Sequence, residues 1–505
     1  MGIKIGWGIR TFSADVPCNI SGQMNMRRSK GVLDPLRATA LCLEGGNGGI
    51  VVFVSCDIAA LGGPIMEDVA KAVHEKFPFI PEDAVIMNAT HTHTSYDIWT
   101  EGDTFPDGSY RYNGPKCREL LYHAAVAAVT EAVEGRKEGG MAYGYGYAVV
   151  GHSRRSIYSE DMSKVLKNRT APNGHAIMYG KTNRPQFWGY EAGADHFLNA
   201  MFTFDAEDKL TGIIVNVPCP SQTSESLHYL SADYWNEVRE FVKKTFGENV
   251  YVLPQCAAAG DTAPRILHYY EAQARRITLK YDLPYVSGQC PPGSEGYLHK
   301  VMGERYDIAD RIVTGLKDIY GWAKNDIQKD VPVRHICRIA NVRKRLITAE
   351  EKAWCENELK EMESERPDPN LLSGEEYSIK KSEFDSIWRR NERTIERYLE
   401  EQAHPEDTTI ETTIHTVQVG DIAFATTMHE IYQDFMHRLQ ARSPFIQTFY
   451  IELCGFGSYI ATTRGRNNKG YSASMYCNRI SDEGGQDIVE NSLEMFDEML
   501  RENEK

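Results

Sequence analysis

The segment from Asp83 to Asp97, DAVIMNATHTHTSYD, joins a strand-like run to a pair of histidines, and we interpret the chain outward from it. Val85 to Met87 is apolar and typical of a strand, and His91-Thr92-His93 follows a few residues later. Side chains two residues apart in an extended segment lie on one side, so the two imidazoles are expected to face the same way. The pair is therefore half of a candidate metal site. The alternative is a polar loop with two solvated histidines, because an isolated HxH pattern has a high false-positive rate.

The residues around this segment predict a β-α-β unit. Residues 38–43 and 50–55 are apolar runs separated by a glycine-rich turn, which predicts a β-hairpin. A helix beginning near Pro64 follows, with apolar residues at helical spacing, and it leads into the strand at 85–87. Residues 50–97 therefore indicate two parallel strands joined by a right-handed crossover.

The rest of the chain alternates in the same way and predicts an α/β fold. The polar stretch 157–196 is expected to be a partly irregular excursion that shapes a binding cleft. Residues 348–402 are rich in Glu, Lys and Arg and predict a helical hairpin on the outside, most simply a solvated face without a functional role. Further strands are expected at 139–150, 198–204, 212–217, 250–253, 333–342, 409–419, 421–426 and 445–453, and helices at 115–135, 235–246, 303–323, 431–439 and 487–500.

Composition narrows the class of protein. The chain has 505 residues, 42% of them hydrophobic, which is ample for a large core. A formal net charge of -15 argues against a nucleic-acid partner and against stable association with an anionic membrane. No apolar stretch is long enough to span a membrane, and the start of the chain has no secretory pattern. Eleven cysteines without a CxxC pair indicate free thiols, so we expect a cytoplasmic protein.

Polar side chains suited to metal binding follow several predicted strands. In open sheets, ligands bind at the carboxyl edge of the strands, so these side chains are expected to converge there. Each also has a simple structural explanation: a buried thiol, a carboxylate at a helix start, or a core aromatic with a satisfied hydroxyl. Together their types are those of a zinc site: His91, His93, Cys219, Asp261, Glu430 and Tyr459.

The order of three motifs resembles the catalytic domain of the neutral/alkaline (non-lysosomal) ceramidases. The resemblance covers nearly the whole chain and is weakest in 157–200 and 345–405. It implies a ceramidase-like fold of mixed sheets flanked by helices, as a single domain over 1–505 with a helical insertion at 348–402 and no C-terminal immunoglobulin-like domain. The motifs are NATHTHTS at 88–95, GDTAP at 260–264, and SYIATT at 458–463 followed by Tyr471.

The resemblance also implies one zinc ion, which the family holds with two histidines, a glutamate and a tyrosine. The place of the second histidine is taken here by Cys219, which precedes a proline, and a thiolate is a good zinc ligand. The implied metal ligands are thus His91, Cys219, Glu430 and Tyr459. The other positions that match the family's active site are His93, Arg155 and Tyr471.

A second departure concerns the family's catalytic serine. Its position is Ala263 in this chain, and the neighbouring Thr262 should point the other way if the segment is extended. A serine-dependent step is therefore not expected. The lack of an export signal and of the immunoglobulin-like domain further indicates that ceramide is not the substrate.

These observations lead to the hypothesis of a cytoplasmic zinc-dependent hydrolase that uses metal-activated water. His93 or Asp261 would act as base, and Arg155 and Tyr471 would bind a substrate oxygen. An amide or N-acyl bond of a small polar substrate is expected from the resemblance. Two alternatives stay open: a hydrolase of glycosides or esters, and a non-catalytic binding protein with a relic site. A homo-oligomer is compatible with the sequence.

Overall fold

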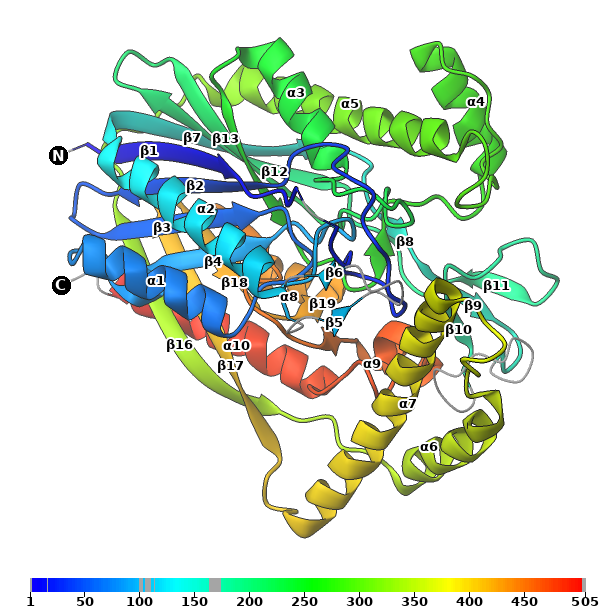
Figure 1. The fold of residues 1–505 in the computed structure, drawn as a ribbon. Coiled ribbons are helices and arrows are strands. Elements are labelled where there is room, and N and C mark those ends of the chain that lie inside the picture. The colour runs from blue at the N-terminus through cyan, green and yellow to red at the C-terminus, as the bar shows by residue number, and fades with distance from the viewer. Residues whose placement is uncertain are drawn as a thin grey trace.

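Two β-sheets packed face to face form the centre of the molecule (Figure 1). The computed structural model describes residues 2–15, 17–99, 103–104, 110–112, 114–162 and 174–501. The larger sheet has the strand order β14 (Tyr251–Cys256), β13 (Leu210–Val217), β12 (Phe197–Asp205), β7 (Lys137–Tyr147), β1 (Lys4–Thr11), β2 (Arg37–Glu44), β3 (Ile50–Cys56) and β4 (Val85–Ala89). The smaller sheet has the order β16 (Val333–Arg343), β17 (Thr409–Val419), β18 (Ile422–Thr426) and β20 (Gln447–Ile451).

The alternation of side chains along the strands explains this packing. In β2 and β3, Leu41 and Phe53 face the smaller sheet, whereas Cys42 and Val52 face the helices on the other side. The Phe53 ring lies 5.0 Å from that of Phe424 in the smaller sheet. Both faces of the larger sheet are thus apolar, and burial of these side chains on both faces is the main source of stability.

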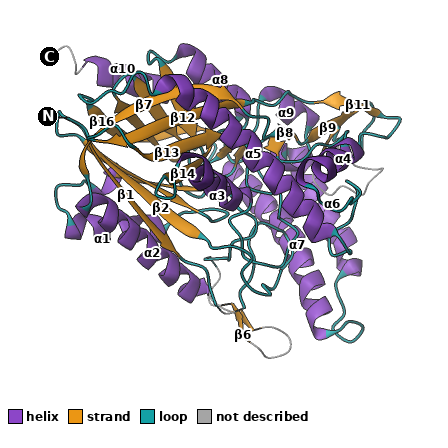
Figure 2. Cartoon of the chain, turned by 90° about the horizontal axis from the view of Figure 1, so that it is seen from above, coloured by secondary structure: helices purple, strands orange, loops and turns teal. Residues whose placement is uncertain are grey.

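Helices cover the outer faces and complete four layers. Helices α1 (Pro64–Lys76) and α2 (Gly114–Glu134) cover the β1–β4 half of the larger sheet (Figure 2), and α3 (Tyr234–Phe246) and α5 (Tyr297–Ala323) cover the other half. Helices α8 (Gln433–Arg442) and α10 (Asp482–Arg501) cover the smaller sheet. The predicted class, mixed α/β with sheets flanked by helices, is confirmed. No helix in the described ranges has the length and apolarity needed to cross a membrane.

Three parallel crossovers direct their strand ends to one edge. They are β3-α1-β4, β13-α3-β14 and β18-α8-β20, each with its two strands paired in parallel. The expected β-α-β unit over 50–97 and the hairpin before it are confirmed. Because parallel strands carry their carboxyl ends to the same edge, the loops that leave β4, β13, β14, β18 and β20 lie near one another.

Some elements differ from the sequence prediction. Helix α5 begins at Tyr297, before the expected start at 303, because Tyr297 and Val301 pack against Leu227 in a tertiary contact that periodicity does not reveal. Helix α4 (Tyr270–Tyr281) was not expected. The polar excursion contains a small sheet in which β9 (Arg155–Tyr158) pairs with β10 (Ala176–Met178) and β11 (Phe187–Tyr190), and its residues 163–173 lie outside the described part.

The charged segment 348–402 is helical, as predicted, and forms α6 (Ala349–Met362) and α7 (Gly374–Ala403). It is more than a solvated face, because α7 holds two loops of the main body. The Ser382 hydroxyl accepts a hydrogen bond from the Met26 amide at 2.9 Å. Arg397 donates to the Met475 carbonyl at 3.0 Å. The helix therefore braces segments that lie next to the site described below.

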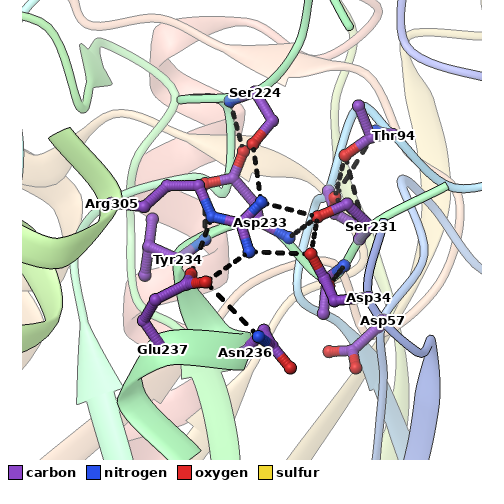
Figure 3. Close-up of polar contacts among 12 residues, drawn as sticks. Asp34, Asp57, Thr94, Ser224, Ser231, Asp233, Tyr234, Asn236, Glu237 and Arg305 are labelled. Atoms are coloured by element: carbon purple, nitrogen blue, oxygen red, sulfur yellow. Dashed lines mark hydrogen bonds and ion pairs between the residues drawn. The ribbon is translucent and has the colours of Figure 1, made fainter. Parts of the chain in front are cut away.

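A buried charge network fixes the loop after β13 (Figure 3). Arg305 of α5 is fully buried and donates to Glu237 at 2.7 Å, to Asp34 at 2.8 Å and to the Ser231 hydroxyl at 3.0 Å. Asp233 accepts from the Tyr234 amide at 2.7 Å and so caps α3. The network ties the sequence around residue 231 to two helices and to the N-terminal part of the chain.

We predict that Arg305→Met lowers the free energy of unfolding by about 3–5 kcal/mol, because it leaves the Asp34 and Glu237 carboxylates buried without a countercharge. The matched control is Arg442→Met, which breaks a half-exposed pair with Glu490 and should change stability by about 1 kcal/mol or less. Denaturant unfolding followed by fluorescence measures both. Equal effects of the two substitutions would contradict the importance of the buried network.

Candidate functional site

Side chains from distant segments meet at the edge to which the crossovers point. Two short strands, β19 (Glu430–Ile431) and β21 (Tyr459–Ile460), pair in parallel and set Glu430 directly opposite Tyr459. His91 Nε2 lies 3.2 Å from the Glu430 carboxylate. The structure thus brings together three of the four predicted metal ligands, His91, Glu430 and Tyr459, with His93 beside them. We call these four residues the His91 cluster.

The two histidines are close for a reason other than the one predicted. Strand β4 ends at Ala89, and His91 has a φ of 60°, in the left-handed region that residues other than glycine seldom adopt. His91 and His93 therefore lie on a turn rather than on an extended strand. Their Nε2 atoms are 3.3 Å apart. The Ala59 carbonyl, 2.6 Å from His91 Nδ1, can only accept, so His91 donates from Nδ1 and directs Nε2 toward Glu430.

Hydrogen bonds also orient His93. The Tyr179 hydroxyl donates to Gln222 Oε1 at 3.2 Å, so the Gln222 amide nitrogen faces His93 and donates to its Nε2 at 2.9 Å. The His91 Nε2 atom thus faces the Glu430 carboxylate at 3.2 Å, and either a proton on Nε2 or a cation bound there would satisfy this contact. His91, Glu430 and Tyr459 are the residues of the cluster whose types can ligate a metal ion.

Glu225 lies behind His93 and completes its environment. Its carboxylate is 3.3 Å from His93 Nδ1 and 2.6 Å from Arg265. Burial lowers the pKa of His93 to about 4, so the imidazole is neutral at pH 7. Burial alone would raise the pKa of Glu225, but Arg265 and His93 lower it to about 2. Sequence reasoning missed Gln222 and Glu225, although both belong to a polar run, 221–225, that directly follows Cys219-Pro220.

A glycine makes room for the His93 ring. Gly22 has a φ of 98°, and a Cβ at this position would lie 2.3 Å from His93 Cγ. The backbone of this segment is held by Arg27, which donates to the His93 carbonyl at 2.6 Å. Because α7 braces Met26, the helical hairpin supports the loop that packs on His93.

The pKa values of Glu430 and Tyr459 are shifted in opposite directions. Burial would raise the pKa of Glu430, but His91 and Arg154 lower it to about 2, so the carboxylate is ionised at neutral pH. Burial and the Glu430 charge raise the pKa of Tyr459 well above its ordinary value. The Tyr471 ring lies 5.9 Å from that of Tyr459, so both predicted tyrosines are at the site.

The arginine beside the cluster is Arg154, whereas the resemblance pointed to Arg155. The Arg154 guanidinium carbon is 5.3 Å from the centre of the Tyr459 ring, and its Nη2 donates to the Gly260 carbonyl at 2.7 Å. Its buried Nε has no acceptor among the described residues. Arg155 instead forms a buried ion pair with Glu191 at 2.5 Å. Arg154 immediately precedes β9 and Arg155 begins it, and consecutive side chains of an extended segment point in different directions, so only one of the two arginines can face the cluster.

Cys219 does not join the cluster. Its side chain is fully buried in the core between the larger sheet and helices α3 and α5, where Sγ contacts the Pro220 carbonyl at 3.5 Å. Burial raises the pKa of the thiol well above its ordinary value, which disfavours the thiolate that zinc requires. Within the described ranges, no group of three or more His, Cys, Asp or Glu side chains is arranged to hold a metal ion. The ligand set predicted with Cys219 is therefore not assembled.

Asp261 and the neighbouring residues also face away from the cluster. Asp261 accepts a hydrogen bond from the Gln433 amide at 3.1 Å and lines a cavity beside the start of α8. This position does not suit the predicted role of base beside His91. The Thr262 hydroxyl donates to the Pro218 carbonyl at 3.1 Å, and Ala263 is fully buried. Thr262 therefore does not replace the serine of the ceramidases.

Comparison with known proteins identifies the architecture. The sequence matches no protein-family model, and no curated protein is significantly similar to it. Among solved structures, the neutral ceramidase from Pseudomonas aeruginosa aligns with a TM-score of 0.63 and 14% identity over 98% of this chain and 73% of its own. A ceramidase complexed with C2 aligns with a TM-score of 0.61 and 15% identity, over 100% of this chain and 76% of its own. This protein therefore has the ceramidase fold, at an identity that leaves its chemistry to be argued from its own residues.

Proposed function

We propose that this protein is a metal-dependent hydrolase that cleaves an amide bond in a small polar substrate. The observation that supports the proposal is the meeting of three side chains of metal-ligating types from distant segments: His91 Nε2 lies 3.2 Å from the Glu430 carboxylate, and Tyr459 is paired directly opposite Glu430. The amide bond is the choice supported by the similarity to ceramidases.

The metal would be held by His91, Glu430 and Tyr459. When bound, a zinc ion or similar metal supplies an activated water and polarises a carbonyl oxygen. The left-handed turn at His91 and the hydrogen bond from Nδ1 to Ala59 fix the imidazole before any metal binds. This preorganisation supports a role for the cluster beyond stability, because strained backbone conformations gather at functional sites.

His93 is suited to accept a proton from the attacking water. It is neutral at pH 7, and its Nε2 would accept the proton once the attacking water takes the place of the Gln222 donor. Glu225 at Nδ1 would stabilise the imidazolium formed by proton transfer. The same relation of a carboxylate, an imidazole and a reacting group operates in catalytic triads. His93 could then return the proton to the amine that leaves.

Arg154 is suited to stabilise the negative charge that develops on the carbonyl oxygen. It is buried beside Tyr459 and Glu430, and its Nε offers a donor that no described residue accepts. A preorganised donor of this kind acts strongly when water is excluded. Arg154, His93, Gln222 and Tyr179 make this part of the site polar, which favours a hydrophilic substrate over a lipid.

The first test is the metal content of the purified protein. We expect about one divalent metal ion per chain, lost in His91→Ala and Glu430→Ala because each removes a ligand. Cys219→Ser is the matched control and should retain the metal, because the Cys219 sulfur lies in the core. Mass spectrometry of dialysed, folded protein measures the content. A wild-type protein without metal, or loss of metal in Cys219→Ser alone, would contradict the assignment.

The second test concerns the bond that is cleaved. We expect hydrolysis of N-acylated amino sugars or N-acyl amino acids to an acid and a free amine, inhibited by a metal chelator. A panel of these amides with glycosides and esters of the same acyl and sugar groups, followed by release of amine, alcohol or acid, measures the preference. Turnover of glycosides or esters without amides would disprove the proposed reaction.

The third test separates the two arginines. Removal of a charge-stabilising donor in Arg154→Met should lower kcat by about 10²- to 10³-fold in the fraction that remains folded. Arg155→Met should act mainly on stability, because it leaves Glu191 buried without its partner. Steady-state kinetics and thermal unfolding of both variants provide the comparison. A normal kcat in folded Arg154→Met would exclude the role given to Arg154.

A further inference from the structure

A cavity lies beside the start of α8, apart from the His91 cluster. Its volume is about 630 Å³, within the range of small-molecule sites. In the described part of the chain, none of His91, His93, Glu430 and Tyr459 lines it. The backbone between them is tightly packed, since a Cβ on Gly260 would lie 2.6 Å from the Glu430 carbonyl oxygen. The residues of the cavity that matter here are Asp195, Phe197, Asp261, Gln433 and His437.

Asp261 brings a buried carboxylate to this cavity. One carboxylate oxygen caps α8 by accepting from the Gln433 amide at 3.1 Å, and the other has no partner among the described residues. Asp261 is 5% exposed, and burial raises its pKa to about 6. Asp195 nearby is already paired with His437 at 3.0 Å. The cavity therefore offers one carboxylate oxygen to a cationic or hydrogen-bond-donating ligand.

Gln433 gives an independent indication of a ligand. Its side chain is 3% exposed and lines the cavity, and its Oε1 accepts from the Asp195 amide at 3.0 Å. Its Nε2 has no acceptor in the described chain. A buried donor without a partner is destabilising, and a ligand oxygen that accepted from it would offset that cost. The ligand should thus carry an acceptor for Gln433 as well as a cation for Asp261.

One aromatic side chain of the cavity lining, Phe197, belongs to an exposed group of three rings. Phe197 lines the cavity and is 43% exposed, with its ring 5.2 Å from Tyr147 and 5.5 Å from Tyr145. Tyr147 and Tyr145 are also largely exposed. An exposed group of three aromatic rings beside hydrogen-bonding side chains suits a compact molecule with one apolar face and a polar rim.

We propose that this cavity is a second binding site, for a polyhydroxylated amine of the amino-sugar class. The ammonium pairs with Asp261, a hydroxyl oxygen accepts from Gln433, and the face of the ring packs on Phe197. The assignment rests on the cavity alone, so it holds whether or not the His91 cluster is catalytic.

Isothermal titration of the full-length protein with D-glucosamine tests the proposal. D-glucose, which lacks the amine, and cyclohexylamine, which lacks the hydroxyls, are the matched probes. We expect saturable binding of D-glucosamine and binding of either control weaker by about tenfold or more. Asp261→Asn keeps the oxygen that caps α8 and Gln433→Met keeps the shape of the side chain, so both should fold and weaken binding by about tenfold or more.

The location is tested with His91→Ala and Glu430→Gln, which should bind D-glucosamine as the wild-type protein does. Thermal unfolding of every variant confirms that it is folded. Absence of saturable binding, equal binding of D-glucose, or unchanged binding in folded Asp261→Asn would overturn the proposal. Loss of binding in folded His91→Ala and Glu430→Gln would also overturn it, because the ligand would then occupy the cluster.

Discussion

The buried guanidinium of Arg305 is the interaction on which the arrangement of the site depends. It pairs with Asp34 and Glu237 and also donates to Ser231. The carbonyl of the same Ser231 accepts from the hydroxyls of Thr92 and Thr94, at 2.8 and 3.1 Å. One buried network thus fixes both the histidine segment and the loop that carries Gln222 and Glu225. A charge that needs several partners at once leaves few alternative positions for either loop.

The His91 cluster contains several features that lower the stability of the folded protein. A left-handed residue, an ionised buried carboxylate and an arginine nitrogen without an acceptor among the described residues occur within a few side chains of one another. Each costs free energy, and the two packed sheets stabilise the protein enough to tolerate them. Concentration of such features at the carboxyl edge of the strands is what the proposed reaction requires, since it needs preorganised groups of opposite charge.

The backbone around Gly260 and Glu430 divides this edge into two sides. Glu430 faces His91, whereas Gln433 and Asp261 belong to the cavity beside α8. A polar residue that follows a strand can therefore face either the His91 cluster or the cavity beside α8. The GDTAP motif shows this most clearly: it lies next to the cluster in space, yet its carboxylate caps α8 on the other side.

The sequence by itself determined the hairpin, the β-α-β unit over 50–97 and the charged helical hairpin, because periodicity and turn residues are local properties. The layered fold and the grouping of His91, Glu430 and Tyr459 were expected from the family resemblance and from the convergence of strand ends at one edge. The sequence did not determine which of Arg154 and Arg155 faces the cluster, that Cys219 stays in the core, or that Gln222 and Glu225 hold His93. Those outcomes depend on the direction of individual side chains, and a shift of one residue along an extended segment reverses that direction. Only packing of the two sheets, the helices and the buried charges decided it.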